Sequence, residues 1–357
     1  MGKNSEYHRK TREQKLAKLH ELEAKLPYYA VAYLDDKELS SQPNTVVGYA
    51  YDLLTFFSYL KDKNPACRAM NTADIPASLL DNLTFADINE YQKYLEYNAN
   101  GVKHNNGESG IARRMAALRG MFHFCCMHGY LTVNPVLGAA RRKKRDDKDI
   151  IRMNAQEVGE LLSVVENTNL KSGKQRKFCQ KTQLRDTAIL TLLLNTGIRV
   201  SECVGLDIGD INFRENTMGI LRKGGKTQRI KFNDDVSAIL MDYIENERSL
   251  LLDEEIESKA LFLSSKKRRM CVKSVENVVK KYAAEAVPDK HITAHKCRST
   301  YGTALYRTTG DIYLVAHMLG HKDINTTSQR YSAMDEEYSK KAASLNIYEK
   351  EKRKDSY

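Results

Sequence analysis

The chain has 357 residues, of which 41% are hydrophobic and 29% are charged. At about 150 residues per domain this length predicts roughly two domains, and it excludes a short scaffold held together by disulfides. The net charge of +11 indicates a polyanionic partner, because a basic surface attracts phosphate backbones and gains free energy by releasing their counterions.

The sequence carries no signal for a membrane or for secretion. No run of about 18 apolar residues occurs, and the N-terminus lacks the apolar stretch of a secretory signal. The seven cysteines are scattered and odd in number, which is typical of reduced thiols packed in a core. We therefore expect a protein of the reducing cytoplasm, without a membrane partner.

The first half of the chain predicts helices. The first 30 residues predict a charged amphipathic helix that ends near Pro27. Apolar residues at spacings of three and four then predict a second helix, with Asn44 or Thr45 as its N-cap. Two further helices are expected over residues 85–99 and 109–131. Together these elements indicate an all-helical N-terminal bundle.

The second half predicts more helices and one small sheet. Short alternating runs between Asp210 and Phe232 are separated by turn residues, which is typical of a small antiparallel sheet. Helices are expected over residues 154–168, 185–206, 234–251, 272–287, 295–308 and 311–319. The fold class predicted from the sequence is therefore mainly α with a small antiparallel sheet (α+β).

Two enzymatic signatures can be tested and set aside. Gly225 and Lys226 look like the end of a phosphate-binding loop, but position 220 is Ile where the motif needs Gly, and a strand-like run follows where the motif needs a helix. The zinc-type ligands between His123 and His128 sit in an apolar helical run and lack a two-plus-two spacing. We expect core packing there, and no metal or other cofactor.

A stronger signal comes from cationic and imidazole side chains in the second half. Arg199 follows an apolar helix in TGIRVSE, and Lys223 lies in RKGGK at the turn between two strands. His295 and Arg298 are three positions apart on a predicted helix, so they share a face. Taken singly, each has an ordinary explanation, such as a buried Arg199 paired with the nearby glutamate of its own motif.

Together these residues indicate phosphoryl transfer. His321 closes the run HMLGH, and Tyr331 follows it. Guanidinium, ammonium and imidazole groups in one site would neutralise a phosphodiester and stabilise the extra charge of its pentacoordinate transition state. A tyrosine hydroxyl is then a suitable nucleophile, since a phosphotyrosyl ester conserves the bond energy and can be reversed.

The order of these motifs resembles the tyrosine recombinase (phage integrase) family, whose pattern is Arg, Lys, His-x-x-Arg, His or Trp, and then Tyr. The resemblance covers residues 154–335 and extends more weakly over residues 26–137. The chain has no Trp, so His321 fills the His-or-Trp position. His321 and Tyr331 are ten positions apart, one more than is common in the family.

The resemblance implies a role for each matching residue. Tyr331 would attack the scissile phosphate to give a 3′-phosphotyrosyl link and a free 5′-hydroxyl. Lys223 would protonate the departing 5′-oxygen, and His295 would assist proton transfer at the tyrosine. Two arginines would clamp the non-bridging oxygens, with an acidic residue supporting the first of them. The residues assigned in this way are Arg199, Lys223, His295, Arg298, His321, Tyr331 and the supporting Glu202. Such chemistry uses no metal and no ATP.

The resemblance also implies a domain organisation. We expect an N-terminal helical extension at 1–25, a helical SAM-like core-binding domain at 26–137, a basic linker at 138–153, a tyrosine recombinase catalytic domain at 154–340 and a charged tail at 341–357. The two domains would form a C-shaped clamp on duplex DNA, and four subunits would assemble on two DNA sites from a protein that is monomeric when free. Two basic runs are expected to contact the DNA backbone: Arg141, Arg142, Lys143, Lys144 and Arg145, and Lys266, Lys267, Arg268 and Arg269.

Several functions are compatible with these motifs. PYYAVAYLDD, ADIPASLLDNL and RKGGK look most similar to single-enzyme Xer recombinases, which resolve chromosome dimers at a dif-like site and would place this protein at the bacterial nucleoid. The alternatives are an integrase or excisionase of a phage or mobile element, an enzyme that relaxes DNA like a type IB topoisomerase, and a DNA-binding protein without catalysis. The sequence gives neither the target site nor any accessory protein.

Overall fold

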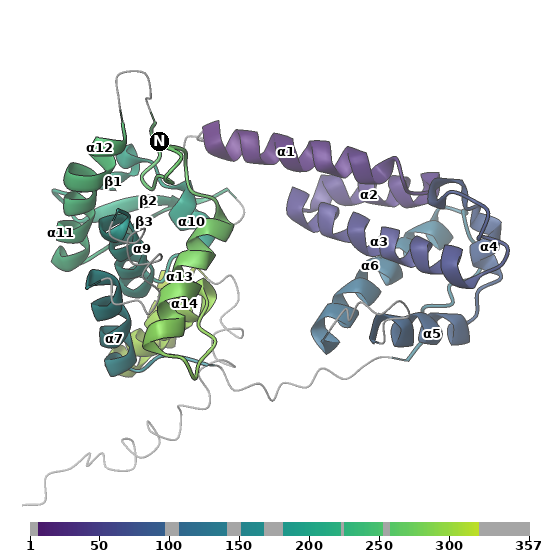
Figure 1. The fold of residues 1–357 in the computed structure, drawn as a ribbon. Coiled ribbons are helices and arrows are strands. Elements are labelled where there is room, and N and C mark those ends of the chain that lie inside the picture. Colours follow the sequence, from purple (N-terminus) through teal and green to yellow (C-terminus); the bar gives the residue numbers. More distant parts are fainter. Residues whose placement is uncertain are drawn as a thin grey trace, which may run out of the picture. The chain divides into compact units, whose positions relative to one another are not determined.

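The computed structural model describes residues 6–96, 107–140, 151–167, 181–222, 225–252 and 258–320. The chain divides into two compact units, an N-terminal unit of residues 3–148 and a C-terminal unit of residues 149–357 (Figure 1). Lys223, His321, Tyr331 and the predicted DNA contacts at 141–145 lie outside the described residues.

The described part of the N-terminal unit is helical. Its elements are α1 (Glu6–Glu23), α2 (Tyr28–Ser40), α3 (Pro43–Lys63), the short 3₁₀ helix η1 (Thr72–Asp74), α4 (Ala77–Asp81), α5 (Phe85–Glu96) and α6 (Glu108–Met127). In Figure 1, α1 runs beside α2 and α3, and it packs against α3. The core is rich in aromatic rings, with Tyr29, Phe56 and Phe122 almost fully buried.

Two details of this unit differ from the sequence prediction. Helix α2 was not expected, and it follows Pro27 directly. Helix α3 begins at Pro43, and no side chain caps its N-terminus, so the predicted N-caps Asn44 and Thr45 are wrong. The physical reason is that proline is well tolerated in the first turn of a helix, where its missing N–H would have no partner.

The C-terminal unit is built around one apolar helix. Its described elements are α7 (Ala155–Glu166), α9 (Gln183–Thr196), α10 (Val200–Gly205), η2 (Ile208–Asp210), β1 (Ile211–Asn212), β2 (Thr217–Leu221), β3 (Thr227–Lys231), α11 (Asp234–Tyr243), the π-helical turn η3 (Ile244–Arg248), α12 (Ser249–Leu251), α13 (Val272–Ala286), α14 (Ala294–Thr309) and α15 (Ile312–Leu319). Helix α9 contacts α7, α11, α13 and α14, and most of its residues are buried. An apolar run with no polar face predicts this kind of enclosure.

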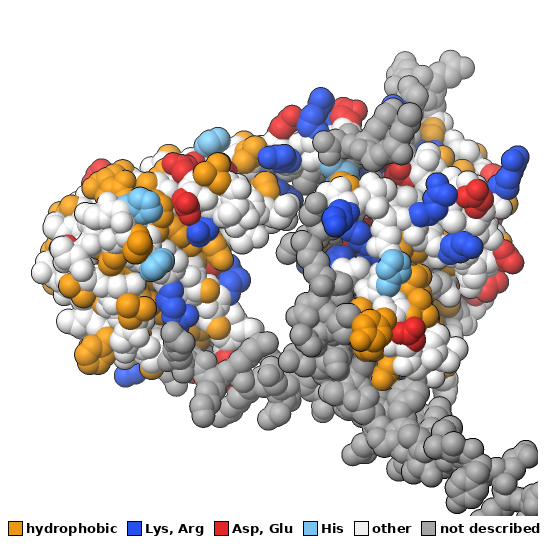
Figure 2. Space-filling model, turned by 180° about the vertical axis from the view of Figure 1, so that it is seen from behind, with side chains coloured by type: hydrophobic (Ala, Val, Ile, Leu, Met, Phe, Trp, Pro, Cys, Tyr) orange, Lys and Arg blue, Asp and Glu red, His pale blue; other side chains and the backbone are white. Residues whose placement is uncertain are grey.

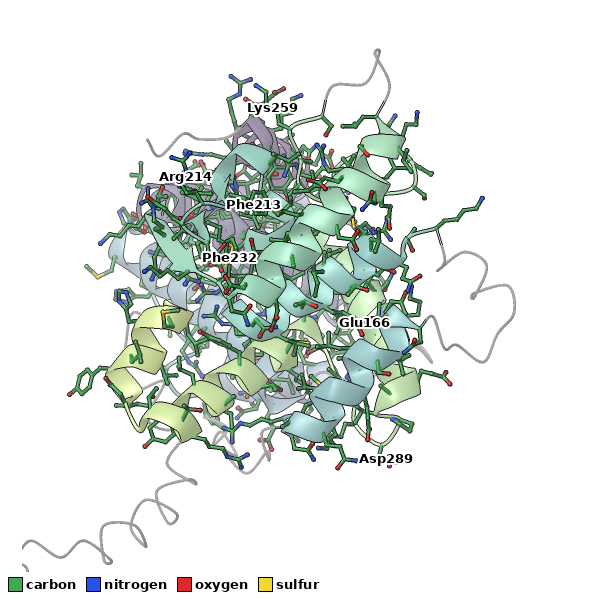
Figure 3. All side chains as sticks on the ribbon, turned by 90° about the vertical axis from the view of Figure 1, so that its left-hand side faces the viewer. Glu166, Phe213, Arg214, Phe232, Lys259 and Asp289 are labelled. Carbon is green, nitrogen blue, oxygen red and sulfur yellow. The ribbon has the colours of Figure 1, made fainter. Side chains whose placement is uncertain are left out.

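The sheet is a three-stranded antiparallel meander in the order β1-β2-β3. Met218 pairs with Ile230, and both side chains are buried. Alternation along β2 places Met218 and Ile220 toward the interior, because successive side chains of a strand point to opposite faces, and Arg222, directly after the strand, continues this pattern. In Figure 3, Phe213 and Phe232 are labelled close to each other in the upper and middle part of the unit, and Asp289 lies at its lower edge.

The mainly helical fold with a small antiparallel sheet confirms the predicted fold class. None of the described helices is long and apolar enough to cross a membrane. Exposed hydrophobic side chains, such as Leu39 and Met127, occur at separate points of the N-terminal unit, and Figure 2 shows such side chains scattered over one face of it.

The described cysteines are free thiols. Cys67, Cys125, Cys203 and Cys297 are buried, and burial raises the pKa of Cys203 and of Cys297 to about 12. These four thiols are neutral side chains of the two cores.

Candidate active site

Arg199 lies in a short connection between α9 and α10. Gly197 ends α9 in the left-handed conformation, with φ of 61°, and its N–H donates to the carbonyl of Leu193. Ile198 is fully buried and anchors the connection. The N–H of Arg199 then donates to Oε2 of Glu202 at 2.7 Å, which fixes the start of α10. The motif TGIRVSE therefore builds a tight turn between two helices.

Glu202 holds the side chain of Arg199 as well as its backbone. Nη1 of Arg199 lies 2.8 Å from Oε1 of Glu202, and only 3% of the Glu202 side chain is exposed. The Arg199 side chain is 32% exposed, so it is paired inside the fold and is also accessible at the surface. Such an arginine can contact an external anion while its carboxylate partner keeps it in place.

Gly197 is predicted to be intolerant of a side chain. A Cβ there would lie 2.4 Å from Cδ1 of Tyr301, in addition to the cost of a positive φ. We expect Gly197→Ala to lower the free energy of unfolding of the C-terminal unit by at least about 2 kcal/mol, as measured by urea denaturation followed by circular dichroism.

Gly159 provides the matched control for that prediction. It lies inside α7, and a Cβ there meets nothing within 4 Å. Gly159→Ala should leave stability unchanged or raise it by up to about 1 kcal/mol, because alanine is the better helix former. Equal stability of the two variants would contradict the steric argument for Gly197.

Arg298 and His295 come from α14. Arg298 is almost fully buried, and its Nη1 donates to the carbonyl of Gly197 at 2.6 Å while its Nη2 donates to the carbonyl of Leu319. His295 lies one turn earlier and is exposed. The structure thus brings Arg298 to the turn that precedes Arg199, although the two arginines are 99 positions apart in the sequence.

The C-terminal end of α15 is where these side chains meet. The last carbonyls of the helix accept hydrogen bonds from four side chains: Gln228 to His317, Arg222 to Met318, Arg298 to Leu319 and Arg199 to Gly320. A helix C-terminus carries unpaired carbonyls and partial negative charge, so cationic donors are favoured there. His321 directly follows Gly320 in the sequence, and Tyr331 comes after it. The predicted residues His321 and Tyr331 therefore belong to the segment that begins at this helix end.

We name Arg199, Arg222 and Arg298 the arginine cluster. Arg222 was not singled out from the sequence, although it precedes Lys223 and stands at an inward position of the strand pattern. Its Nη1 lies 2.9 Å from Oε2 of Glu202. One carboxylate therefore pairs with two arginines of the cluster.

The second basic run forms the tip of a tight hairpin. Leu263 bridges to Arg269, and the N–H of Lys267 donates to the carbonyl of Ser264. Lys266 and Arg268 are exposed. Arg269 instead donates to the carbonyls of Val204 and Leu206 and pairs with Asp207, which gives it a structural role at the end of α10.

No group of side chains suited to a metal ion occurs within the described ranges. The core packing expected for the zinc-type set is confirmed for Cys125, which is buried in the N-terminal unit, and is wrong for His123 and His128, which are exposed. His128 stacks on Phe124, so the ring packs against a neighbouring aromatic side chain.

Comparison with known proteins identifies the family. Residues 151–337, which are 187 of the 357 residues, match the phage integrase family. The chain belongs to this family. It is a tyrosine recombinase, an enzyme that breaks and rejoins DNA strands.

Curated relatives of this recombinase include Xer-type enzymes. The chain is 29% identical over 343 residues to the tyrosine recombinase XerS of Streptococcus agalactiae serotype III, covering 88% of this chain and 94% of the relative. It is also 29% identical over 309 residues to the tyrosine recombinase XerC of Caldanaerobacter subterraneus, covering 85% and 82%.

Solved structures share the fold. XerH bound to a palindromic difH substrate has a TM-score of 0.61 at 20% identity, covering 85% of this chain and 79% of that one. A lambda integrase dimer bound to a core site has a TM-score of 0.57 at 16% identity, covering 84% and 94%. The recombinase fold predicted from the motifs is confirmed.

Proposed function

We propose that this recombinase cuts and rejoins duplex DNA at a specific site through a 3′-phosphotyrosyl intermediate. The observation that carries this proposal is the convergence of Arg199 and Arg298 on the turn at Gly197 and on the end of α15. Two guanidiniums at one place can bind both non-bridging oxygens of a phosphodiester and stabilise the charge that develops there. Tyr331 serves as the nucleophile and His321 as a further donor to the phosphate.

Proton transfer completes the mechanism. Lys223 protonates the 5′-oxygen as it leaves, and His295, exposed at the start of α14, assists proton transfer at the tyrosine. Glu202 acts by holding Arg199, because its carboxylate binds both the backbone and the side chain of that residue.

Binding of duplex DNA depends on basic residues outside the active site as well as on the proposed catalytic residues. Lys266 and Arg268 lie exposed at the hairpin tip, where they would contact the phosphate backbone, and Arg141 to Arg145 would add a second basic segment. The net charge of +11 favours this partner. The domain boundaries expected from the sequence, the clamp around DNA and the assembly of four subunits on two sites belong to the same proposal.

The biological role that we propose is chromosome dimer resolution at a dif-like site, in the cytoplasm of a bacterium and at its nucleoid. Coverage of XerS is nearly complete, and the solved relatives include XerH on its difH substrate. Integration or excision of a mobile element is the second candidate, favoured by the likeness to lambda integrase on its core site. A dif-like palindrome near the gene would favour the first role, and flanking phage genes the second.

A trapped covalent adduct tests the chemistry. We expect the wild-type protein, incubated with a nicked duplex that carries the candidate site, to form a protein–DNA adduct that survives denaturing electrophoresis. The nick lets the short cleaved strand diffuse away, so the reverse reaction is blocked.

Two results would redirect this proposal. Binding of the duplex with no adduct would overturn it in favour of a DNA-binding protein without catalysis. Relaxation of supercoiled plasmids that lack the site would favour an activity like that of a type IB topoisomerase.

A further inference from the structure

Arg222 directly follows strand β2, and each of its three guanidinium nitrogens donates a hydrogen bond. Only 8% of the residue is exposed. Its Nε donates to Oε1 of Gln228 at 2.8 Å, its Nη1 to Oε2 of Glu202 at 2.9 Å and its Nη2 to the carbonyl of Met318 at 2.7 Å. The guanidinium therefore links three elements: the neighbouring strand β3, helix α10 and the C-terminal end of α15.

The backbone of Arg222 is fixed as well. Its N–H donates to the carbonyl of Lys226 at 2.8 Å, and its carbonyl accepts the N–H of Gly225 at 3.0 Å. These two bonds close the turn that joins β2 to β3, and Lys223 is the next residue in the sequence. A shift of Arg222 would therefore be passed on to the lysine that follows it.

Gly320 has no side chain, and the guanidinium of Arg222 fills the space that a side chain there would take. A Cβ on Gly320 would lie 2.8 Å from Nε and 3.0 Å from Cζ of Arg222. A second bond supports the same contact, since Nε2 of Gln228 donates to the carbonyl of His317 at 3.3 Å. The end of α15 is thus shaped to receive the guanidinium, and the hairpin is held there by two side chains.

A charge buried this deeply needs its carboxylate partner. Glu202 supplies it, and the same carboxylate pairs with Arg199. Burial lowers the pKa of Arg222, while Glu202 acts in the opposite direction. Removing one partner of a buried pair is costly, so the contact is expected to persist through the reaction.

We propose that Arg222 is a positioning residue: it fixes the turn that carries Lys223 against Glu202 and the end of α15, and so sets the reach of the lysine to the leaving 5′-oxygen. This inference rests on the proposed function, in which Lys223 is the general acid. Arg222 itself touches no reacting atom. Its substitution should therefore impair the protonation of the leaving group more than the attack on phosphorus.

A change of leaving atom distinguishes these two effects. An alkoxide, like hydroxide, is the conjugate base of a very weak acid, so it leaves slowly without a proton. A thiolate, whose conjugate acid has a pKa of about 8.5, leaves unprotonated. A nicked duplex with sulfur in place of the bridging 5′-oxygen therefore bypasses the general acid.

The experiment measures single-turnover cleavage by the full chain on the oxygen and sulfur duplexes. We expect Arg222→Met to cleave the oxygen duplex about 10- to 100-fold more slowly than wild type, and the sulfur duplex within about threefold of wild type. Lys223→Met should show the same pattern with a larger loss on oxygen. Arg229→Met provides the matched control, because Arg229 is an exposed arginine on the neighbouring strand β3, and both rates should be unchanged.

Gln228→Ala keeps the test decisive if Arg222→Met fails to fold. Gln228 is only partly buried, and its loss removes one partner of Arg222 together with the bond to His317. We expect a smaller defect on oxygen that sulfur again relieves. A defect of equal size on both duplexes, or no defect in either variant, would overturn the inference. Failure of the wild type to form an adduct on either duplex would instead overturn the proposed function.

Discussion

Replacing Tyr331 by phenylalanine should abolish the covalent adduct and leave DNA affinity unchanged. Phenylalanine keeps the aromatic ring and removes only the hydroxyl that attacks phosphorus. Loss of an enzyme's nucleophile removes the chemical step, so adduct formation should fall by at least about 10³-fold. Denaturing electrophoresis of the labelled nicked duplex measures the adduct, and a native gel shift measures binding.

Tyr313 is the matched control for this substitution. It lies on α15 with 67% of its surface exposed, so Tyr313→Phe removes an equivalent hydroxyl from an open position. The adduct should form at the wild-type rate. If Tyr331→Phe still formed the adduct, another residue would be the nucleophile, and the assignment based on the family pattern would be wrong.

Asn in place of Asp186 should produce the largest loss of stability in the C-terminal unit. Asp186 is fully buried in α9. Its Oδ1 accepts Nε and Nη2 of Arg185, and its Oδ2 accepts Nζ of Lys281 at 2.9 Å and the hydroxyl of Tyr282 at 3.1 Å. Removing the carboxylate charge leaves a buried guanidinium without its counterion, which costs about 3–5 kcal/mol.

Calorimetry of the full chain measures this effect. For a unit of this size, 1 kcal/mol corresponds to a change of about 2–4 °C in Tm, so Asp186→Asn should lower the transition of the C-terminal unit by roughly 10 °C. Glu215→Gln is the control, because Glu215 forms an exposed pair with Arg229 whose contribution is at most about 1 kcal/mol. Similar shifts in both variants would mean that burial does not make the Asp186 carboxylate more important than an exposed one.

The predictions from the sequence were most accurate where contacts between nearby residues determine the structure. Gly197 ends α9, and Glu202 reaches back to the N–H of Arg199 three positions earlier, so both contacts lie within one motif. The sheet was also predictable, because alternation and turn residues are local signals. The His-x-x-Arg motif placed His295 and Arg298 on one helix, as the structure has them.

Long-range contacts were not predictable in this way. Arg222 was not singled out from the sequence, because its burial depends on Glu202, 20 positions earlier, and on Met318, 96 positions later. The hydrogen bonds of Arg269 to the end of α10 are of the same kind. Helix α2 was missed for another reason: its buried side chains are confined to its first two turns, and its second half is polar.

The end of α15 has a consequence for the kinds of sequence change that this enzyme can accept. All four side chains that meet there bind backbone carbonyls, which every residue possesses, so the side chains of the exposed His317 and the partly buried Met318 can vary without removing an acceptor. Insertion or deletion of one residue in α15 is different, because each position turns the helix by about 100°. Such a change would turn the carbonyls away from the arginine cluster. We therefore expect homologous chains to vary in residue type at positions 317 and 318 while keeping the length of α15 and the glycine at position 320.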